Sequence, residues 1–561
     1  MSDILLIPSA GTVPDEMKLD VGPIPTGMVP LHGKPSIEHI IDSFVDCGDC
    51  DDITVVVAHQ PKHSSLVNWT RESEYKIERV QVESPSTLAT TVSKTIDAID
   101  ERGVLGNNHL YVQFADTLVF PTCVDGDKDQ IVYDTVDHPV RWTTFKTSSG
   151  GKIESVSEKF SGVSNSRSNT FVGQFRFEEP RAFLQELIRA MESSDSSAEE
   201  VSAFYRAVLS YLSGRTYEIR QPSKWIDLGH LDTYYRAKLD YLNVREFNEL
   251  EIDSQSGVLT KQSDNTSVLN DELNWYRNIP AAIQPYTPEI YDYELGENPS
   301  IMMEYLGYPP LSDIHLYGHH GLHIWRNIFS TIFDIVEEFR GHCMPNSAAT
   351  ENMDALQSMY VDKTVSRLER VRNQQRFDLF FDSDEIIING DQFYSLPRIL
   401  DSLLNDVESV GLLELDSFTV IHGDLCFPNI LFDVRSGNVK LIDPRGDFGG
   451  LGIYGDYRYD LAKLIHSAKG NYEFIINDRF TVDVDGDGVD YTIHTTDQHQ
   501  EREQLFDSMI EARYPKELSQ LYAIESLLWL SMAALHGDSR ERQYVMLAQG
   551  IEKYNQSFNQ R

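Results

Sequence analysis

The N-terminal half of the chain alternates short apolar runs with segments of helical periodicity, and this pattern constrains the fold most strongly. Residues 4–7, 53–58 and 110–114 are nearly continuous apolar runs, as expected of strands covered on both faces. Residues 36–45 have the spacing of an amphipathic helix. Repeated strand–helix alternation predicts an α/β, Rossmann-like domain with a mostly parallel sheet and helices on both sides.

The pattern changes at residue 245. Short strands are predicted at 247–252, 258–261 and 300–305, and the rest is largely helical apart from residues 418–443. A chain of 561 residues is also too long for a single hydrophobic core. We therefore expect two domains, residues 1–244 and residues 245–561, the second of α+β type.

The charge of the chain excludes some partners. There are 88 acidic and 48 basic residues, for a formal net charge of -40. Such a surface repels nucleic acid and anionic lipid, so we expect neither as a partner. The acidity is typical of a strongly solvated surface, and an acidic docking face is the alternative.

Nothing in the sequence predicts export or membrane insertion. The N-terminus lacks the basic region of a signal peptide, and the longest apolar stretch, residues 527–535, is too short to span a bilayer. The five cysteines are too few for a disulfide framework, and the Cys47–Cys50 CxxC pair has no second pair to complete a zinc site. We expect a cytoplasmic protein.

The strongest motif is a set of polar residues between apolar runs near the C-terminus. His422-Gly-Asp424 is followed by Asn429 and then by Asp443, and the flanking runs predict a hairpin that fixes these side chains. Phosphoryl transfer to a hydroxyl needs a carboxylate to accept the proton and oxygen ligands for Mg²⁺. Asp424 suits the first role, and Asn429 and Asp443 suit the second. His422 is interpreted as a structural loop residue.

These motifs resemble the HGDxxxxN and IDxxG motifs of the aminoglycoside phosphotransferase/choline kinase family, over residues 245–561. The resemblance implies a protein-kinase-like fold, ATP as phosphate donor, and Lys261 and Glu272 as a nucleotide-binding pair. It also implies that residues 302–306 contact adenine and that Asp460 supports the catalytic loop. The acceptor is then a small molecule with a hydroxyl group.

A second acidic motif resembles a calcium-binding loop only in part. Asp483, Asp485 and Asp487 imitate the start of a calcium loop, but the twelfth position is His494 instead of the glutamate of an EF-hand. We expect a tight hairpin turn.

The N-terminal half resembles the sugar-nucleotide-forming nucleotidyltransferases of the GT-A-like class. The matching segments, in family order, are 5–11 with Gly11, 25–41, Phe114-Ala-Asp116, the hairpin 151–159 with Glu158-Lys159, and Trp225-Ile-Asp227-Leu-Gly229. The resemblance implies that Asp116 and Asp227 hold Mg²⁺, that Lys159 holds the substrate phosphate, and that CTP or UTP is the nucleotidyl donor.

The nucleotide loop departs from the family pattern. It carries no arginine between Gly11 and Lys18, and Thr26 occupies the place of a family lysine. Lys18 is the candidate replacement for binding the nucleotide. Two alternatives stay open: an active nucleotidyltransferase, or a degenerate domain that binds only a nucleotide or a partner.

The leading hypothesis is a bifunctional enzyme. Its kinase domain would phosphorylate a sugar or amino alcohol, and its nucleotidyltransferase domain would convert the product to an activated precursor for capsule or other surface glycans. The alternatives are a kinase with a non-catalytic N-terminal domain and a non-catalytic nucleotide-binding scaffold. The sequence leaves the acceptor, the nucleotide and the oligomeric state open.

Overall fold

The computed structural model divides into two compact units, Met1–Lys238 (unit 1) and Leu239–Arg561 (unit 2). The boundary expected at 244/245 lies outside the described residues. The structure describes residues 3–46, 53–83, 87–120, 128–137, 139–148, 151–158, 167–193, 201–242, 249–253, 256–263, 265–296, 298–345, 353–374, 376–486 and 488–558.

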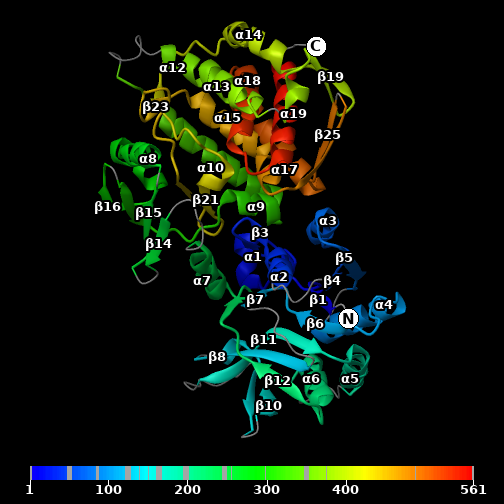
Figure 1. The fold of residues 1–561 in the computed structure, drawn as a ribbon. Coiled ribbons are helices and arrows are strands. Elements are labelled where there is room, and N and C mark those ends of the chain that lie inside the picture. Colours follow the sequence, from blue (N-terminus) through cyan, green and yellow to red (C-terminus); the bar gives the residue numbers. More distant parts are fainter. Residues whose placement is uncertain are drawn as a thin grey trace. The chain divides into compact units, whose positions relative to one another are not determined.

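Unit 1 is built on a nine-stranded sheet (Figure 1). Its path is β10-β9-β11-β6-β1-β4-β5, with β8 beside β11 and β12 beside β8. The neighbours β6, β1, β4 and β5 pair in parallel, whereas β11 runs antiparallel to β6. The strands are β1 (Asp3–Pro8), β4 (Ile53–His59), β5 (Ile77–Gln81), β6 (His109–Gln113), β8 (Asp129–Val136), β9 (Thr144–Thr147), β10 (Ile153–Ser157), β11 (Ser168–Phe177) and β12 (Tyr217–Arg220).

Strand β1 is covered on both faces, as its apolar run predicted. Ile4 and Leu6 belong to one hydrophobic core, and the alternate residues Leu5 and Ile7 are equally buried on the opposite face. Helices α4, α5 and α6 pack against one another. The helices of this unit are α1 (Asp15–Val21), α2 (Ser36–Val45), α3 (Ser64–Glu72), α4 (Leu88–Glu101), α5 (Pro180–Glu192), α6 (Ala203–Leu212) and α7 (Leu231–Leu242), with the 3₁₀ turns η1 (Thr26–Met28) and η2 (Pro139–Arg141).

Two short strand pairs complete unit 1. β2 (Pro30–Leu31) pairs with β3 (Lys34–Pro35), and β7 (Thr117–Phe120) pairs with β13 (Lys224–Asp227). The second pair places Asp116, which directly precedes β7, close to Asp227, which ends β13.

Unit 2 begins with a four-stranded antiparallel sheet in the order β14-β15-β17-β16 (Figure 1). Its elements are β14 (Glu249–Asp253), β15 (Val258–Gln262), α8 (Thr266–Asn278), η3 (Gln284–Tyr286), β16 (Ile290–Glu294) and β17 (Ser300–Glu304). The predicted strands at 258–261 and 300–305 thus correspond to β15 and β17.

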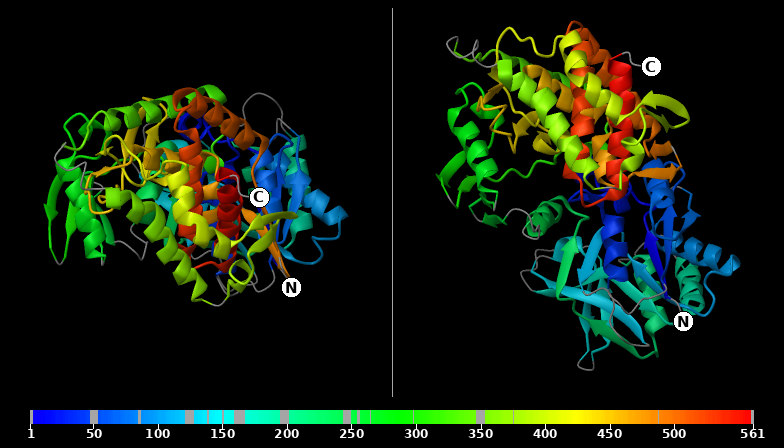
Figure 2. Two further views of the ribbon diagram at one scale, coloured as in Figure 1. Left: turned by 90° about the horizontal axis from the view of Figure 1, so that it is seen from above. Right: turned by 45° about the horizontal axis from the view of Figure 1, so that its top comes forward.

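The rest of unit 2 is mainly helical, and α13, α15, α18 and α19 lie side by side (Figures 1 and 2). By length and composition the segment Leu518–Leu535 could cross a membrane, but 67% of it is buried, and the core helix of a globular unit passes the same test. The helices are α9 (Leu311–Tyr317), α10 (Leu322–Arg340), α12 (Met353–Gln357), the π-helical turn η4 (Ser358–Asp362), α13 (Lys363–Arg372), α14 (Leu396–Ser409), α15 (Tyr457–Ala468), α16 (Tyr472–Ile476), α17 (Asp497–Arg513), α18 (Leu518–Met532) and α19 (Arg540–Ser557), with the 3₁₀ turns η5 (Asp378–Phe380), η6 (Phe427–Asn429) and η7 (Ala533–Leu535).

The helical region contains more strand than the sequence reading predicted. A second four-stranded sheet, β19-β18-β25-β24, includes the hairpin β18 (Glu385–Ile388) and β19 (Asp391–Tyr394). The missed signal was Asn389-Gly390, whose φ angles of 51° and 83° allow a tight hairpin turn. The hairpin expected around residue 485 is confirmed, because β24 (Phe480–Asp485) pairs with β25 (Gly488–Ile493).

Candidate active sites

Lys261 on β15 connects two carboxylates of unit 2. Its Nζ lies 2.8 Å from Glu272 Oε2 on α8 and 2.7 Å from Asp443 Oδ1. Burial acts to lower the pKa of the Lys261 ammonium, but the two carboxylates outweigh burial and raise it. The lysine therefore stays charged while it links the sheet, α8 and the segment that carries Asp443.

Asp424 is accessible and is held from two sides. Its side chain is 40% exposed, and its Oδ1 lies 2.7 Å from Lys463 Nζ on α15. Asn429 Nδ2 donates to the Asp424 carbonyl at 2.9 Å and to Oδ2 at 3.2 Å. Partial burial acts to raise the pKa of the Asp424 carboxyl, but Lys463 prevails and the pKa is lowered. The carboxylate is thus ionised and oriented, as a proton acceptor must be.

The loop around Asp424 is fixed from beneath by Asp460. The buried Asp460 carboxylate accepts hydrogen bonds from the backbone N–H groups of His422 (2.7 Å) and Gly423 (2.8 Å). Burial lowers the pKa of His422 to about 4, so its ring is neutral, in keeping with a structural role. Gly423 has a φ of 78°, and a Cβ at this position would lie 2.8 Å from Arg445 Cβ.

The predicted hairpin brings Asn429 and Asp443 to the same end. β21 (Ile430–Asp433) and β22 (Asn438–Leu441) pair antiparallel, and Ile442 N donates to the Asn429 carbonyl at 3.0 Å. Within the described ranges no group of three or more His, Cys, Asp or Glu residues could hold a metal ion. Two oxygen-bearing side chains nevertheless fit Mg²⁺, because this ion usually takes its remaining ligands from water and substrate phosphates.

Strand pairing also brings Asp116 and Asp227 together in unit 1. Thr117 is opposite Asp227 in the β7–β13 pair, and Leu228 N donates to the Asp116 carbonyl at 2.8 Å. Gly229 adjoins both carboxylates: a Cβ there would lie 2.9 Å from Asp116 Oδ2 and 3.2 Å from Asp227 Oδ1. Glycine is needed at this position because any side chain would crowd the two carboxylates.

The electrostatics of this pair favour a cation. Burial and the neighbouring Asp227 raise the pKa of Asp116 to about 6. Asp227 accepts hydrogen bonds from His230 Nδ1 at 2.7 Å, Gly229 N at 2.9 Å and Thr233 Oγ1 at 3.0 Å. Two converging carboxylates are a donor set that fits Mg²⁺.

The remaining described residues predicted for the N-terminal site make local contacts in unit 1. The carbonyl of Gly11 accepts from Thr26 N at 3.3 Å, and Lys18 on α1 forms an ion pair with Asp15 at 2.6 Å. Glu158 accepts from Ser202 N at 2.7 Å. Lys159 lies outside the described residues, as do Cys47 and Cys50.

The sequence reading missed the cations around Asp424. Lys463 lies three residues after Asp460 on α15, and Arg445 lies two residues after Asp443. Their positions within and beside the recognised motifs were the available signal. Only the fold shows that both act on Asp424.

Comparison with known proteins supports the N-terminal assignment. Residues 23–244 match the model of the nucleotidyl transferase family. This segment includes Asp116, Glu158, Lys159 and Asp227. Unit 1, which has a mixed α/β fold with a mostly parallel central sheet, is thus similar to the nucleotidyl transferases. No curated protein matches the chain.

Several solved structures are similar to part of the chain. HddC from Yersinia pseudotuberculosis, complexed with GMP-PN, has 17% identity and a TM-score of 0.31, covering 43% of this chain and 100% of its own. A putative glucose-1-phosphate thymidylyltransferase from Bacillus anthracis has 16% identity and a TM-score of 0.34, with coverages of 44% and 97%. A nucleoside-diphosphate-sugar pyrophosphorylase from Vibrio cholerae RC9 has 18% identity and a TM-score of 0.33, with coverages of 42% and 99%.

Proposed function

We propose that the chain is a bifunctional enzyme with one active site in each unit. Unit 2 transfers the γ-phosphate of ATP to a hydroxyl group of a small molecule. Unit 1 then joins the phosphorylated product to a nucleotide taken from CTP or UTP and releases pyrophosphate.

The observation that carries the kinase assignment is the placement of Lys261. It lies within ion-pair distance of both Glu272 and Asp443, as the resemblance to the phosphotransferase family implies for a nucleotide-binding site. In the same unit Asp424 presents an ionised carboxylate that can accept the proton of an attacking hydroxyl. Three separate parts of the chain thus supply the groups that phosphoryl transfer needs.

The nucleotidyltransferase assignment rests on the family match and on the Asp116–Asp227 pair. In each unit Mg²⁺ would offset the negative charge of the phosphates. Asp116 and Asp227 would hold it in unit 1, and Asn429 and Asp443 in unit 2. Lys159 is proposed to hold the phosphate of the acceptor.

A fusion of these two activities has a physical advantage. A phosphorylated product released by one unit meets the second site of the same chain at a raised effective concentration. We infer a cytoplasmic role in supplying precursors for surface glycans, on the basis of the family resemblance alone.

One observation favours a second candidate, a kinase with a non-catalytic unit 1. Thr26 supplies no charge where the family has a lysine, and Lys18 is paired with Asp15. An assay in two stages decides between the candidates. ADP formation is measured with Mg²⁺-ATP and a panel of hydroxyl compounds, and the product is then supplied with each NTP while pyrophosphate is followed.

The bifunctional proposal requires both ADP and pyrophosphate. Asp443→Ala and Asn429→Ala should raise the Mg²⁺ concentration needed for ADP formation. An unchanged Mg²⁺ titration in both variants would show that these residues do not hold the metal. ADP formation without pyrophosphate from any NTP would leave unit 1 as a binding domain.

A further inference from the structure

Basic side chains converge beside Asp424 in unit 2. Tyr459 Oη, on α15, accepts from Lys363 Nζ at 3.0 Å and from Arg445 Nη1 at 3.4 Å. Lys463 follows one turn after Tyr459 on the same helix and pairs with Asp424. We name Lys363, Arg367, Arg445 and Lys463 the basic cluster.

One face of helix α13 contributes two members. Lys363 and Arg367 are four residues apart, and Arg370 continues the same face toward solvent. Arg367 interacts electrostatically with Asp424, Tyr459 and Arg445. A π-helical turn, η4, directly precedes Lys363, and such turns are often found at functional sites.

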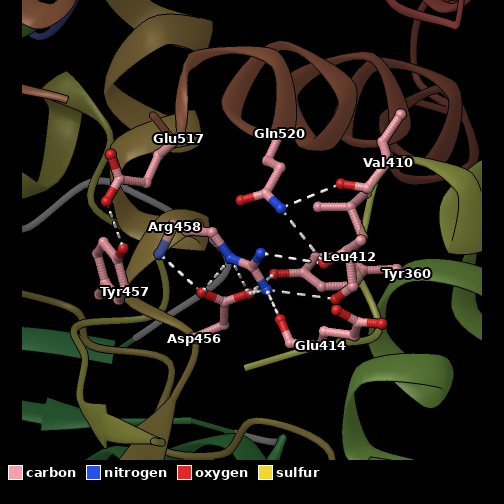
Figure 3. A network of polar contacts seen from close by, with 10 residues as sticks. Tyr360, Val410, Leu412, Glu414, Asp456, Tyr457, Arg458, Glu517 and Gln520 are labelled. Carbon is pink, nitrogen blue, oxygen red and sulfur yellow. Dashed lines mark hydrogen bonds and ion pairs between the residues drawn. The ribbon is translucent and has the colours of Figure 1, made fainter. Parts of the chain in front are cut away.

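A buried network fixes the two helices that carry the cluster (Figure 3). Tyr360 in η4 donates to Asp456 Oδ2 at 2.7 Å, and the Asp456 side chain caps the N-terminus of α15. Arg458 Nε donates to both carboxylate oxygens of Asp456, and its Nη2 reaches the carbonyls of Leu412 and Glu414. The positions of Lys363 on α13 and of Tyr459 and Lys463 on α15 are therefore set in advance.

The cluster has more positive charge than its neighbours neutralise. Among the described residues, Lys463 pairs with Asp424, whereas Lys363, Arg367 and Arg445 form no ion pair with a carboxylate. The chain has 88 acidic against 48 basic residues, so unneutralised cations stand out. Burial lowers the pKa of Lys363 to about 8, with Arg445 and Arg367 adding to the effect. An anion at this place would stabilise every member of the cluster.

We propose that the basic cluster binds an anionic group on the phosphate acceptor of unit 2, so that the acceptor is a hydroxyl compound that carries a phosphate or a carboxylate. This inference rests on the proposed kinase activity. In the reaction the acceptor hydroxyl oxygen forms a bond to the γ-phosphorus, the bond from that phosphorus to the bridging oxygen of ADP breaks, and the hydroxyl proton passes to Asp424. The cluster holds the anionic end of the acceptor and orients its hydroxyl toward Asp424. A sugar phosphate or a sugar acid fits this chemistry, and an amino alcohol does not.

The test compares matched acceptors on the full-length chain. Glucose, glucose 6-phosphate, glucuronate and choline are supplied with Mg²⁺-ATP, and ADP is measured. We expect turnover with the phosphate or the carboxylate compound, and the two arms identify which anion is preferred. Turnover with choline or glucose but with neither anion would overturn the inference and leave the kinase proposal intact.

Variants of the cluster provide the second readout. Arg367→Gln and Lys363→Met should raise KM for the anionic acceptor about 10- to 100-fold, with KM for ATP unchanged, because each removes a charge-assisted contact. Arg367→Lys should restore part of the affinity. Arg372→Gln, an exposed arginine on the same helix, is the matched control and should behave as wild type. A rise in KM for ATP with no change for the acceptor would assign the cluster to the nucleotide and contradict the inference.

A binding measurement covers the case in which none of these acceptors turns over. Calorimetry with glucose 6-phosphate and with glucuronate, without ATP, should show a binding event that Arg367→Gln abolishes and Arg372→Gln keeps. Equal binding to wild type, Arg367→Gln and Arg372→Gln would show that the anion binds outside the basic cluster, and it would overturn the inference. The kinase proposal itself fails separately, if ADP forms with no hydroxyl compound of the wider panel.

Discussion

The two sites carry opposite excess charge. In unit 1, Asp116 and Asp227 converge, no described lysine or arginine pairs with either, and the pKa of Asp116 rises to about 6. In unit 2, cations surround Tyr459, and they lower its pKa to about 7 although burial acts to raise it. Each site thus lacks the counter-charge that its proposed ligand would bring: a metal cation in unit 1 and an anionic acceptor in unit 2.

The two units also differ in whether the chain's own lysines neutralise the carboxylates of the site. The carboxylates of unit 2 are held by lysines, Glu272 and Asp443 by Lys261 and Asp424 by Lys463. The groups of unit 2 are therefore oriented by lysines, whereas in unit 1 Asp227 is held by His230 and no described lysine or arginine pairs with Asp116. Substitutions should affect the two units in different ways.

The largest effect is expected from Asp424→Ala. Loss of a positioned general base should reduce ADP formation by about 10²- to 10⁴-fold, while pyrophosphate release by unit 1 is unchanged. Asp401→Ala, at an exposed position on α14, is the control. A folded Asp424→Ala protein with near-normal turnover would remove the basis for the kinase site.

Lys261→Met should destabilise unit 2 by about 3–5 kcal/mol, because it leaves Glu272 buried without its partner. Denaturant unfolding followed for the transition of unit 2 measures this change. Lys261→Met combined with Glu272→Leu should recover most of the loss, and Lys516→Met, at an exposed position, should cost little. If Lys261→Met alone were as stable as wild type, Lys261 would not be needed to neutralise Glu272, and this difference between the two units would fall away.

In unit 1, Asp227→Ala and Gly229→Ala should each reduce pyrophosphate release, by about 10- to 150-fold, and Lys159→Ala should slow it in the same range. Asp227→Ala removes a metal ligand, and the added methyl of Gly229→Ala would occupy space 2.9 Å from Asp116 Oδ2. ADP formation should survive all three. Gly537→Ala, where a Cβ meets open space, is the control for the glycine substitution. Equal pyrophosphate release in all these proteins would contradict the two-carboxylate site.

The smallest effect is spectroscopic and tests the sign of the charge in unit 2. The ordinary pKa of tyrosine is about 10, whereas Tyr459, with a pKa of about 7, should be largely ionised at pH 8. Ultraviolet difference spectra between pH 6 and pH 8 should show about one tyrosinate in wild type and none in Tyr459→Phe. Lys363→Met removes a neighbouring cation and should move this titration to higher pH. A titration of Tyr459 near pH 10 in wild type would show that the cluster is already neutralised.

Much of the local structure follows from the sequence. The helix expected at 36–45 is α2, and the runs at 4–7 and 53–58 lie within β1 and β4. These elements are set by local periodicity, with strands covered on both faces and an amphipathic helix between them. The hairpin that brings Asn429 and Asp443 together is likewise predictable, because only a short turn separates its strands.

The β18–β19 hairpin shows where the sequence reading failed. Asn389-Gly390 marks the turn, but the strands on either side are only four residues long, and each could equally be read as part of a helical region. Their assignment depends on β25, which pairs with β18 from a distant part of the chain.

The sequence by itself supplied the residue types that each proposed chemistry needs: Asp424, Asn429 and Asp443 in one motif set, Asp116 and Asp227 in the other. Only the tertiary structure decided which charges meet. Lys261 and Asp443 are 182 positions apart, and the basic cluster draws on α13, α15 and the segment after Asp443. The physical reason is that periodicity and turn propensity act over a few residues, whereas the electrostatic character of a site is the sum of groups that only the packed fold brings within a few ångströms.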